Sequence, residues 1–411
     1  MLASAALVLF MTPGLAIFYG GMVRAKSALN MMMMSFAAIG VTTIIWVLYG
    51  YSLTFGTSQG GLIGDLGNIG LSGTLDQVVG AEGHQIPTLA FAMFQLTFAI
   101  ITVALLSGAI ADRAKYGSWV LFVAAWVTLV YIPVAHWAFA SQSGSGGWII
   151  DKLGALDFAG GTVVEINSGA AALALAIVLG KRDGFRRDPM RPHNMPLVLL
   201  GAGMLWFGWF GFNAGSALSA GSLAATAMIN TQIASAAAAM SWITFEKFRD
   251  GKATTLGVAS GAIAGAVVIT PACGYVNPIG ALILGLIAGV ASSYAVSRKY
   301  KFGYDDSLDV VGVHGVSGIV GMIGIGLFAT ATVNATGKEG LFINGSPDLL
   351  IKQLIAIVAV AAFSFCATWL IATVITRTIG FRVPREEVLT GLDTTYHAES
   401  AYDITGNSNR Y

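Results

Sequence analysis

Eleven long apolar stretches follow one another along this chain, and they restrict its possible folds more than any other feature. They cover residues 2–19, 31–55, 88–110, 117–139, 161–180, 196–217, 221–245, 254–272, 278–297, 311–331 and 351–376. Each is close to the roughly 20 residues that a helix needs to cross the hydrocarbon core of a bilayer. Charged residues make up only 10% of the sequence, whereas soluble domains contain roughly 25%. The sequence therefore predicts an all-α integral membrane protein with eleven transmembrane helices.

The positions of lysine and arginine predict how these helices are oriented. Of the 22 lysines and arginines, only Lys152, Lys338 and Lys352 fall outside the connections on one side of the predicted membrane. Because cytoplasmic loops are enriched in these residues, the N-terminus is expected outside and the C-terminus in the cytoplasm. Met1 opens directly into the first stretch, so no removable signal peptide is expected. A multi-pass protein of the cell inner membrane fits this pattern.

The most basic connection divides the first ten stretches into two groups of five. Five helices per group invert the second group relative to the first, as in many transporters. We therefore predict a 5+5 inverted repeat followed by a final helix. The predicted segments are a first five-helix half (1–180), a basic cytoplasmic linker (181–195), an inverted second half (196–331), an extracellular loop with the eleventh helix (332–378) and a cytoplasmic tail (379–411).

A short motif recurs in both halves and supports the repeat. Residues 165–169 (E-I-N-S-G) and 314–318 (H-G-V-S-G) share the pattern X-x-x-S-G, and each begins with a rare ionisable residue of its half. A two-fold axis in the membrane plane would bring Glu165 and His314 together near the midplane. Because a charged side chain within a membrane is costly, this pair is expected to face the bundle interior and mark a pathway.

Each residue of the pair also has a purely structural interpretation. Glu165 could be a carboxylate that is hydrogen-bonded to Asn167 or Ser168, and His314 a core histidine bonded to a backbone carbonyl. Asp309 precedes His314 in the sequence. We expect it to cap the N-terminus of that helix.

Aromatic residues in two further stretches predict a site for a small cation. Phe94 and Phe98 are four residues apart and share one helix face, as roughly do Trp209 and Phe212. Ser216 follows one turn later, among glycine and alanine residues that leave space beside the rings. Such rings usually serve in packing. Here, ring faces and a hydroxyl oxygen could together hold a cation that sheds its water.

Other classes of function find little support in the sequence. The net charge of +1 gives no reason to expect a nucleic-acid partner. Cys273 and Cys366 both lie inside apolar runs, so we expect two small buried residues, no disulfide and no metal site. Because no nucleophile or metal cluster accompanies Glu165 and His314, catalytic residues and cofactors are not expected.

Eight stretches, taken in order, resemble the ammonium transporter (Amt/Mep/Rh) family, and specifically its bacterial Amt type. They are residues 13–21 (P-G-L-A-I-F-Y-G-G), 94–98 (F-Q-L-T-F), 131–137 (Y-I-P-V-A-H-W), 154–164 (G-A-L-D-F-A-G-G-T-V-V), 208–216 (G-W-F-G-F-N-A-G-S), 270–275 (T-P-A-C-G-Y), 309–318 (D-V-V-G-V-H-G-V-S-G) and 391–402 (G-L-D…H-A-E-S-A-Y). The resemblance implies a homotrimer in the lipid bilayer with one pore within each subunit. It also implies ammonium or ammonia as substrate, with methylammonium as an analogue.

The resemblance further implies roles for individual residues. Phe98 and Phe212 would form a stacked phenyl gate, with Phe94 and Trp209 beside the pore. Ser216 and the face of Phe98 would recruit the cation. Asp157 would be the family's buried acid, which supports that site without necessarily touching the substrate.

Two departures from the family pattern matter for the mechanism. Glu165 replaces the first of the family's twin pore histidines, whereas His314 matches the second. Phe139 stands where most members have a recruiting tryptophan, so weaker cation binding is expected. Ammonium would be recruited by Phe98, Phe139 and Ser216 and then lose a proton. Ammonia would cross the pore while Glu165 and His314 relay the proton.

Other interpretations remain open at this point. One is an ammonium sensor, although about 30 tail residues leave no room for an appended signalling domain. Another is a neutral channel for ammonia gas. A third is that Glu165 admits potassium or another cation.

In the family, the tail contacts the neighbouring subunit and takes part in closure by a PII-type signalling protein at the cytoplasmic face.

Overall fold

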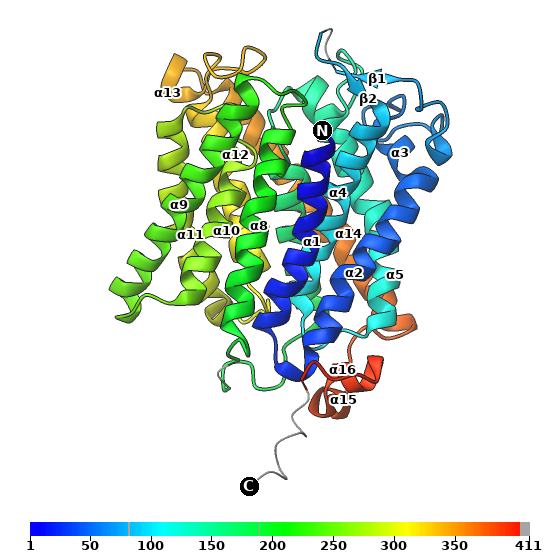
Figure 1. Ribbon diagram of the computed structural model, residues 1–411, viewed down its shortest axis with the longest axis vertical. Helices are drawn as coiled ribbons and strands as arrows, with labels where there is room; N and C mark the ends of the chain where they lie inside the picture. Colours follow the sequence, from blue (N-terminus) through cyan, green and yellow to red (C-terminus); the bar gives the residue numbers. More distant parts are fainter. Residues whose placement is uncertain (81–82, 189, 403–411) are drawn as a thin grey trace.

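The computed structural model describes residues 1–80, 83–188 and 190–402, most of which form a bundle of long helices (Figure 1). The longer helices are α1 (Leu2–Met22), α2 (Ala28–Ile45), α4 (Thr88–Leu106), α5 (Tyr116–Trp126), α6 (Ile132–Phe139), α7 (Asn167–Leu179), α8 (Met195–Gly215), α9 (Ser222–Asp250), α10 (Thr255–Ile269), α11 (Pro278–Phe302), α12 (Val316–Phe328) and α14 (Asp348–Thr378). Short α-helices are α3 (Tyr51–Phe55), α13 (Leu341–Asn344), α15 (Arg385–Thr390) and α16 (Leu392–His397).

Several helices contain or adjoin turns that are not α-helical. Turns of 3-10 helix are η1 (Ala25–Ser27), η3 (Ile69–Leu71) and η4 (Ser107–Ile110). Turns of π-helix are η2 (Trp46–Gly50), η5 (Val127–Tyr131), η6 (Trp148–Leu153), η7 (Gly161–Ile166) and η8 (Val311–Gly315). Two short strands, β1 (Val78–Val79) and β2 (Ile86–Pro87), pair in antiparallel fashion in the loop before α4.

Within the described residues, ten helical segments are long and apolar enough to cross a membrane. Each coincides with one predicted stretch. The stretch predicted at 254–272 differs, because its helix α10 has only 15 residues. At 1.5 Å per residue it spans about 22 Å, less than the roughly 30 Å of the hydrocarbon core. Pro271 explains the early end, since the residue before a proline is disfavoured in a helix.

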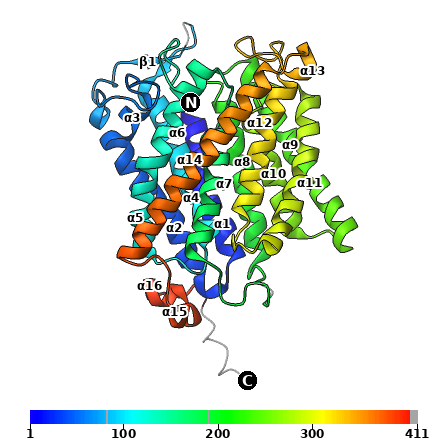
Figure 2. The ribbon, with the colours of Figure 1, turned by 180° about the vertical axis from the view of Figure 1, so that it is seen from behind.

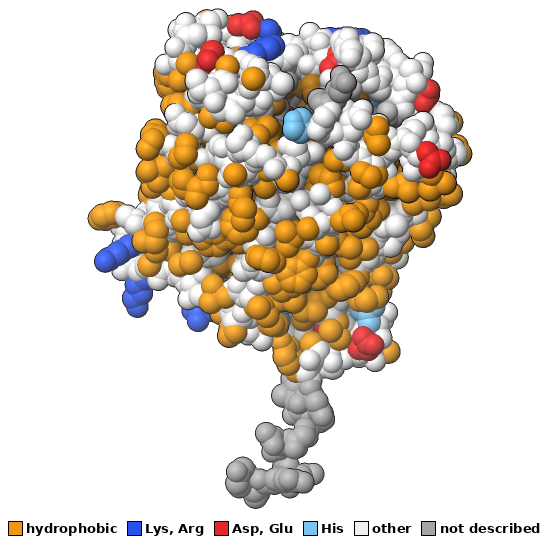
Figure 3. Space-filling view, turned by 45° about the horizontal axis from the view of Figure 1, so that its top comes forward, with side chains coloured by type: hydrophobic (Ala, Val, Ile, Leu, Met, Phe, Trp, Pro, Cys, Tyr) orange, Lys and Arg blue, Asp and Glu red, His pale blue; other side chains and the backbone are white. Residues whose placement is uncertain are grey.

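The outer surface of the bundle is that of a membrane protein. Large apolar side chains such as Phe36, Ile44 and Phe207 are exposed, and apolar side chains cover the middle of the face in Figure 3, with charged ones near its edges. Cys366 belongs to this outer surface, on α14, whereas Cys273 is buried. The expectation that both cysteines are buried is therefore wrong for Cys366, because α14 runs across the outer face of the bundle (Figure 2).

The two ends of the bundle differ in what they carry. Helix α1 begins towards the end that carries α13, whereas α15 and α16 lie at the opposite end (Figure 1). The tail packs onto the bundle there, because the Asp393 carboxylate accepts hydrogen bonds from the backbone nitrogens of Leu29 and Asn30 at the start of α2. The described part of the tail is thus held against the connection between α1 and α2 and against the start of α2.

Candidate functional site

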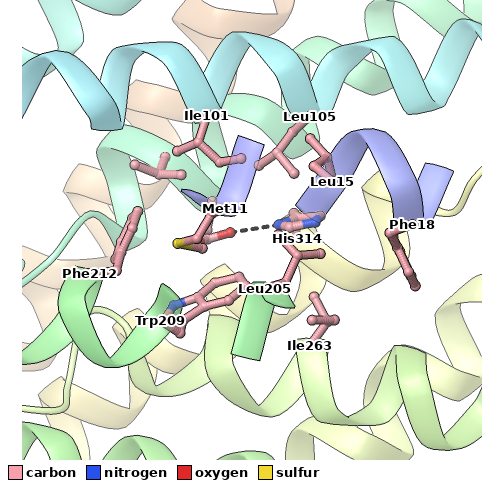
Figure 4. A pocket seen from close by; sticks show the side chains of 12 residues that line it. Met11, Leu15, Phe18, Ile101, Leu105, Leu205, Trp209, Phe212, Ile263 and His314 are labelled. Atoms are coloured by element: carbon pink, nitrogen blue, oxygen red, sulfur yellow. Dashed lines mark hydrogen bonds and ion pairs between the residues drawn. The ribbon is translucent and has the colours of Figure 1, made fainter. Parts of the chain in front are cut away.

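A narrow cavity lies in the middle of the bundle, between α1, α4, α8, α10, η7 and η8 (Figure 4). Its free volume is about 10 Å³, about the room that one water-sized molecule needs. Phe212 and Phe18 lie towards its two opposite ends in Figure 4, with His314 between them. The lining is apolar apart from Glu165, His314 and Trp209; it consists of Met11, Leu15, Phe18, Ile101, Leu105, Val164, Glu165, Leu205, Trp209, Phe212, Ile263 and His314.

Glu165 and His314 are in direct contact at this cavity. Oε2 of Glu165 lies 2.8 Å from Nδ1 of His314, the interaction drawn as a dashed line in Figure 4. Both side chains are buried. The alternative partners of Glu165 are engaged elsewhere: Asn167 donates to the carbonyl of Val163, and Ser168 donates to the backbone carbonyl of Glu165. Within the described residues, the other carboxylate oxygen, Oε1, has no hydrogen-bond partner.

The glycine of each X-x-x-S-G motif allows the two segments to approach. A Cβ at Gly318 would lie 2.8 Å from the Cβ of Glu165, closer than real side chains come. A Cβ at Gly169 would overlap the backbone of Gly315. Small residues let membrane helices come this close. The first position of the motif therefore supplies the ionisable residue, and its final glycine leaves space for the partner segment.

Four phenylalanines form a cluster at one end of the cavity. The rings of Phe98 on α4 and Phe212 on α8 are stacked, with centroids 4.0 Å apart and 25° between their planes. Phe94 lies edge-on to Phe98 at 4.8 Å. Phe139, at the end of α6, also lies edge-on to Phe98 at 6.3 Å. The structure therefore brings together the four phenylalanines that the sequence analysis names, although they come from distant parts of the chain.

The remaining predicted residues of α8 lie next to this cluster. Trp209 lines the cavity and donates its indole N–H to Oγ1 of Thr270 over 2.8 Å. Ser216, half-buried at the end of α8, donates its hydroxyl hydrogen to the carbonyl of Phe212. Its oxygen lone pairs remain available to another donor. Thr270 was not selected from the sequence, since only the fold brings it to the tryptophan.

Asp157 has both carboxylate oxygens occupied by its own loop. Oδ1 accepts the backbone N–H groups of Gly160 and Gly161, and Oδ2 accepts the N–H and hydroxyl of Thr162. These donors begin η7, the π-helical turn that carries Glu165. The carboxylate thus fixes the start of that segment.

Another acidic group lies at the start of the helical segment that carries His314. The carboxylate of Asp306 accepts the N–H of Val311 at the start of η8, whereas Asp309 pairs with Lys299. The expectation that Asp309 caps this helix is therefore wrong, and Asp306 takes that place. Burial and the charge of Asp309 raise the pKa of Asp306 to about 6, although the charge of Lys299 opposes the shift.

Known proteins are similar to this chain along nearly its whole length. The family profile described as Ammonium Transporter Family matches residues 1–402. An ammonium transporter of Mycobacterium bovis is 51% identical over 426 residues, which cover 98% of this chain and 89% of that protein. The crystal structure of Candida albicans Mep2 is 35% identical, with a TM-score of 0.85 over 94% of this chain and 85% of that one.

A structure named as a sensor Amt protein is also similar. It is 28% identical, with a TM-score of 0.86 over 96% of each chain. The family profile and the M. bovis relative agree with the resemblance found in the sequence, and they describe transporters rather than enzymes. The chain therefore belongs to the ammonium transporter family.

Proposed function

We propose that this protein carries ammonium across the membrane as ammonia and a separate proton. Ammonium is recruited by the faces of Phe98 and Phe139 and by the hydroxyl of Ser216. It loses a proton near the stacked rings of Phe98 and Phe212. Ammonia then crosses the narrow cavity, while the proton passes along Glu165 and His314.

The surroundings of the ring cluster support the recruiting step. Ring faces attract cations, and Ser216 keeps lone pairs for an ammonium N–H because its own hydrogen is donated to Phe212. Phe98 and Phe212, stacked at 4.0 Å, close the path to a hydrated ion. Asp157 belongs to this site as a support, since its own loop already occupies both of its carboxylate oxygens.

The contact between Glu165 and His314 carries the relay proposal. A carboxylate and an imidazole joined over 2.8 Å can pass a proton between them. The cavity beside them is apolar and has room for about one small molecule. A bare cation would lose its hydration there at high cost, whereas neutral ammonia would not. Separate paths for ammonia and the proton resolve this conflict.

The proposal includes the inverted repeat, with α10 as an eleventh crossing helix. One parallel between the halves supports it. A π-helical turn leads into a 13-residue α-helix in each half, as η7 into α7 and η8 into α12, and each of these segments carries one copy of the motif. We also propose that the N-terminus lies outside the inner membrane and the tail in the cytoplasm, because most lysines and arginines lie at the end that carries α15 and α16. A homotrimer and a PII-type partner at the tail are proposed from the family resemblance.

Electrical measurements on reconstituted protein test the relay. Liposomes containing the wild type or Glu165→Gln receive rapid steps of ammonium, methylammonium and potassium. We expect an ammonium current in the wild type and a much smaller one in the variant, because the amide cannot ionise. Glu399→Gln, the same change at an exposed tail residue, serves as the control. Equal currents in wild type and Glu165→Gln would refute the relay.

The same experiment separates the alternatives. Rapid alkalinisation inside the liposomes without any current would indicate a neutral ammonia channel instead. A potassium current in the wild type would indicate that Glu165 relaxes selectivity. A sensor role has one supporting observation, the similarity to the sensor Amt structure, and it predicts ammonium binding with little flux.

A further inference from the structure

Four arginines surround a second cavity, at the end of the molecule that carries α15 and α16. Its volume is about 50 Å³. Since one water molecule needs roughly 10–15 Å³ by the same measure, there is room for a small polyatomic ion. The charged residues that line it are Arg113, Arg182, Arg382, Arg385, Asp112 and Asp183.

Backbone contacts between distant segments build this cavity. Ala114 and Arg382 form an isolated β-bridge, and the N–H of Val383 donates to the carbonyl of Arg113 over 2.9 Å. The guanidinium of Arg382 also donates to the carbonyls of Leu179 and Lys181, each over 2.6 Å. The segment that follows α14 is thereby joined to the connections before α5 and after α7, and the arginines are held in place before any ligand arrives.

The charges around the cavity do not balance. Three carboxylates line the cavity or form an ion pair with one of its arginines, and each has an arginine partner; the pairs are Arg182–Asp305, Arg24–Asp112 and Arg385–Asp183. Two further arginines at the cavity, Arg113 and Arg382, have no carboxylate of their own in these pairs. Arg382 donates to backbone carbonyls, and Arg113 lies 3.9 Å from Asp305, which Arg182 already binds through two nitrogens.

Arg113 is the most constrained of these groups. Its side chain is 1% exposed, and within the described residues its Nε has no hydrogen-bond partner. Burial lowers the pKa of Arg113 to about 10; the charges of Asp305 and Asp306 oppose this shift, whereas those of Arg182 and Arg382 add to it. A buried cation that remains charged at neutral pH requires a counter-charge.

We propose that this cavity binds a phosphate-type oxyanion, at a site separate from the ammonium path. Two excess positive charges match a dianion, and hydrogen bonds from a charged guanidinium to phosphate oxygens are among the strong ones. The phosphate group is either free in solution or carried by a lipid headgroup. Bound there, the anion stabilises the contact between the tail and the connections after α4 and α7.

Thermal unfolding of the detergent-solubilised protein tests the site without a transport assay. Unfolding is followed in increasing sodium phosphate, with sodium chloride at matched ionic strength as reference. A ligand that binds only the folded state raises the unfolding temperature as its concentration increases. We expect phosphate to do so and chloride not to. Equal effects of the two salts would overturn the proposal.

Two exposed residues of the cavity predict opposite effects on phosphate binding. Arg385→Gln removes a positive charge and should weaken binding about two- to fivefold, the range for an exposed charge pair. Asp183→Asn removes a negative charge and should strengthen binding by a similar factor. Arg187→Gln, an exposed arginine that does not line this cavity, should change nothing. The same affinity in all three variants would overturn the proposal.

A second ligand distinguishes the source of the phosphate group. Short-chain phosphatidic acid presents the same group on a lipid, and the corresponding phosphatidylcholine presents a zwitterionic headgroup. Stabilisation by inorganic phosphate supports a soluble ligand. Stabilisation by phosphatidic acid alone supports a lipid headgroup, provided that the stabilisation is largest in Asp183→Asn, smaller in the wild type and smallest in Arg385→Gln. An equal rise in unfolding temperature in the wild type and both variants would overturn the proposal.

Discussion

Gln353 on α14 holds the backbone of Leu156 through both ends of its side-chain amide. Its Oε1 accepts the N–H of Leu156 over 2.8 Å, and its Nε2 donates to the carbonyl of Leu156 over 2.7 Å. Gln353 is fully buried. Leu156 directly precedes Asp157, which fixes the start of η7. The position of Glu165 therefore depends on a contact between residues that are 197 positions apart.

Replacing Gln353 with leucine should disturb both stability and transport. The change leaves the N–H and carbonyl of Leu156 without partners, at a cost of roughly 1–3 kcal/mol for each buried group. We expect a lower unfolding temperature and a higher ammonium concentration for half-maximal current. Gln85→Leu, in an exposed loop, is the control. A Gln353→Leu protein that matches the wild type in both measurements would show that the loop before η7 keeps its position without Gln353.

Gly318→Ala should separate the buried pair while leaving both ionisable groups intact. The added methyl group would meet the Cβ of Glu165 at 2.8 Å, so Glu165 or its helix must shift. Overpacking of this kind costs about 1–3 kcal/mol. We expect the ammonium current to fall towards that of Glu165→Gln. Gly203→Ala is the matched control, because nothing lies within 4 Å of its Cβ position. Normal current in Gly318→Ala would mean that the contact is not needed.

The sequence predicts the helices and the pair because both depend on local or rare features. A long apolar stretch indicates a crossing helix wherever it occurs. An ionisable residue such as Glu165 inside such a stretch is easily noticed, because burying its charge in the membrane costs free energy. The length of α10 was harder to predict, since its apolar stretch continues beyond Ile269 although the helix stops. Pro271 was the available signal for that stop.

Contacts with backbone groups could not be predicted in the same way. Gln353 and Thr270 bind partners far away in the sequence, and a buried glutamine or threonine has no pattern that identifies its partner. Asp306 and Asp309 are both suitable caps by position, but Asp309 has a φ of 66° and pairs with Lys299 instead. The arginine cavity exists only because the tail returns to the connection before α5.

Phe139→Trp should increase the apparent affinity for ammonium. Indole has the strongest cation–π attraction, and the gain at a partly exposed site is about 0.5–1 kcal/mol, or roughly two- to fivefold. Phe139 is half-buried and already lies edge-on to Phe98. The concentration for half-maximal current measures the effect, with Phe139→Leu expected to move it in the opposite direction. Identical values for tryptophan, phenylalanine and leucine would exclude Phe139 from recruitment.

Asp306 should make the stability of the protein depend on pH. Its folded-state pKa is about 6, above the ordinary value near 4. The folded state therefore favours the neutral carboxyl group, and this contribution is present below pH 4 and is lost as the pH rises through 6. The loss is at most about 3 kcal/mol, since each pKa unit corresponds to about 1.4 kcal/mol.

Asp306→Asn tests this dependence because the amide oxygen can still accept the N–H of Val311. The unfolding temperature of the variant, relative to the wild type, should rise between pH 4 and pH 7 and then stay constant. Asp76→Asn, at an exposed loop position on the opposite end, should show no such change. A difference between Asp306→Asn and wild type that does not vary with pH would mean that Asp306 is ionised throughout this range, with Lys299 rather than burial setting its charge.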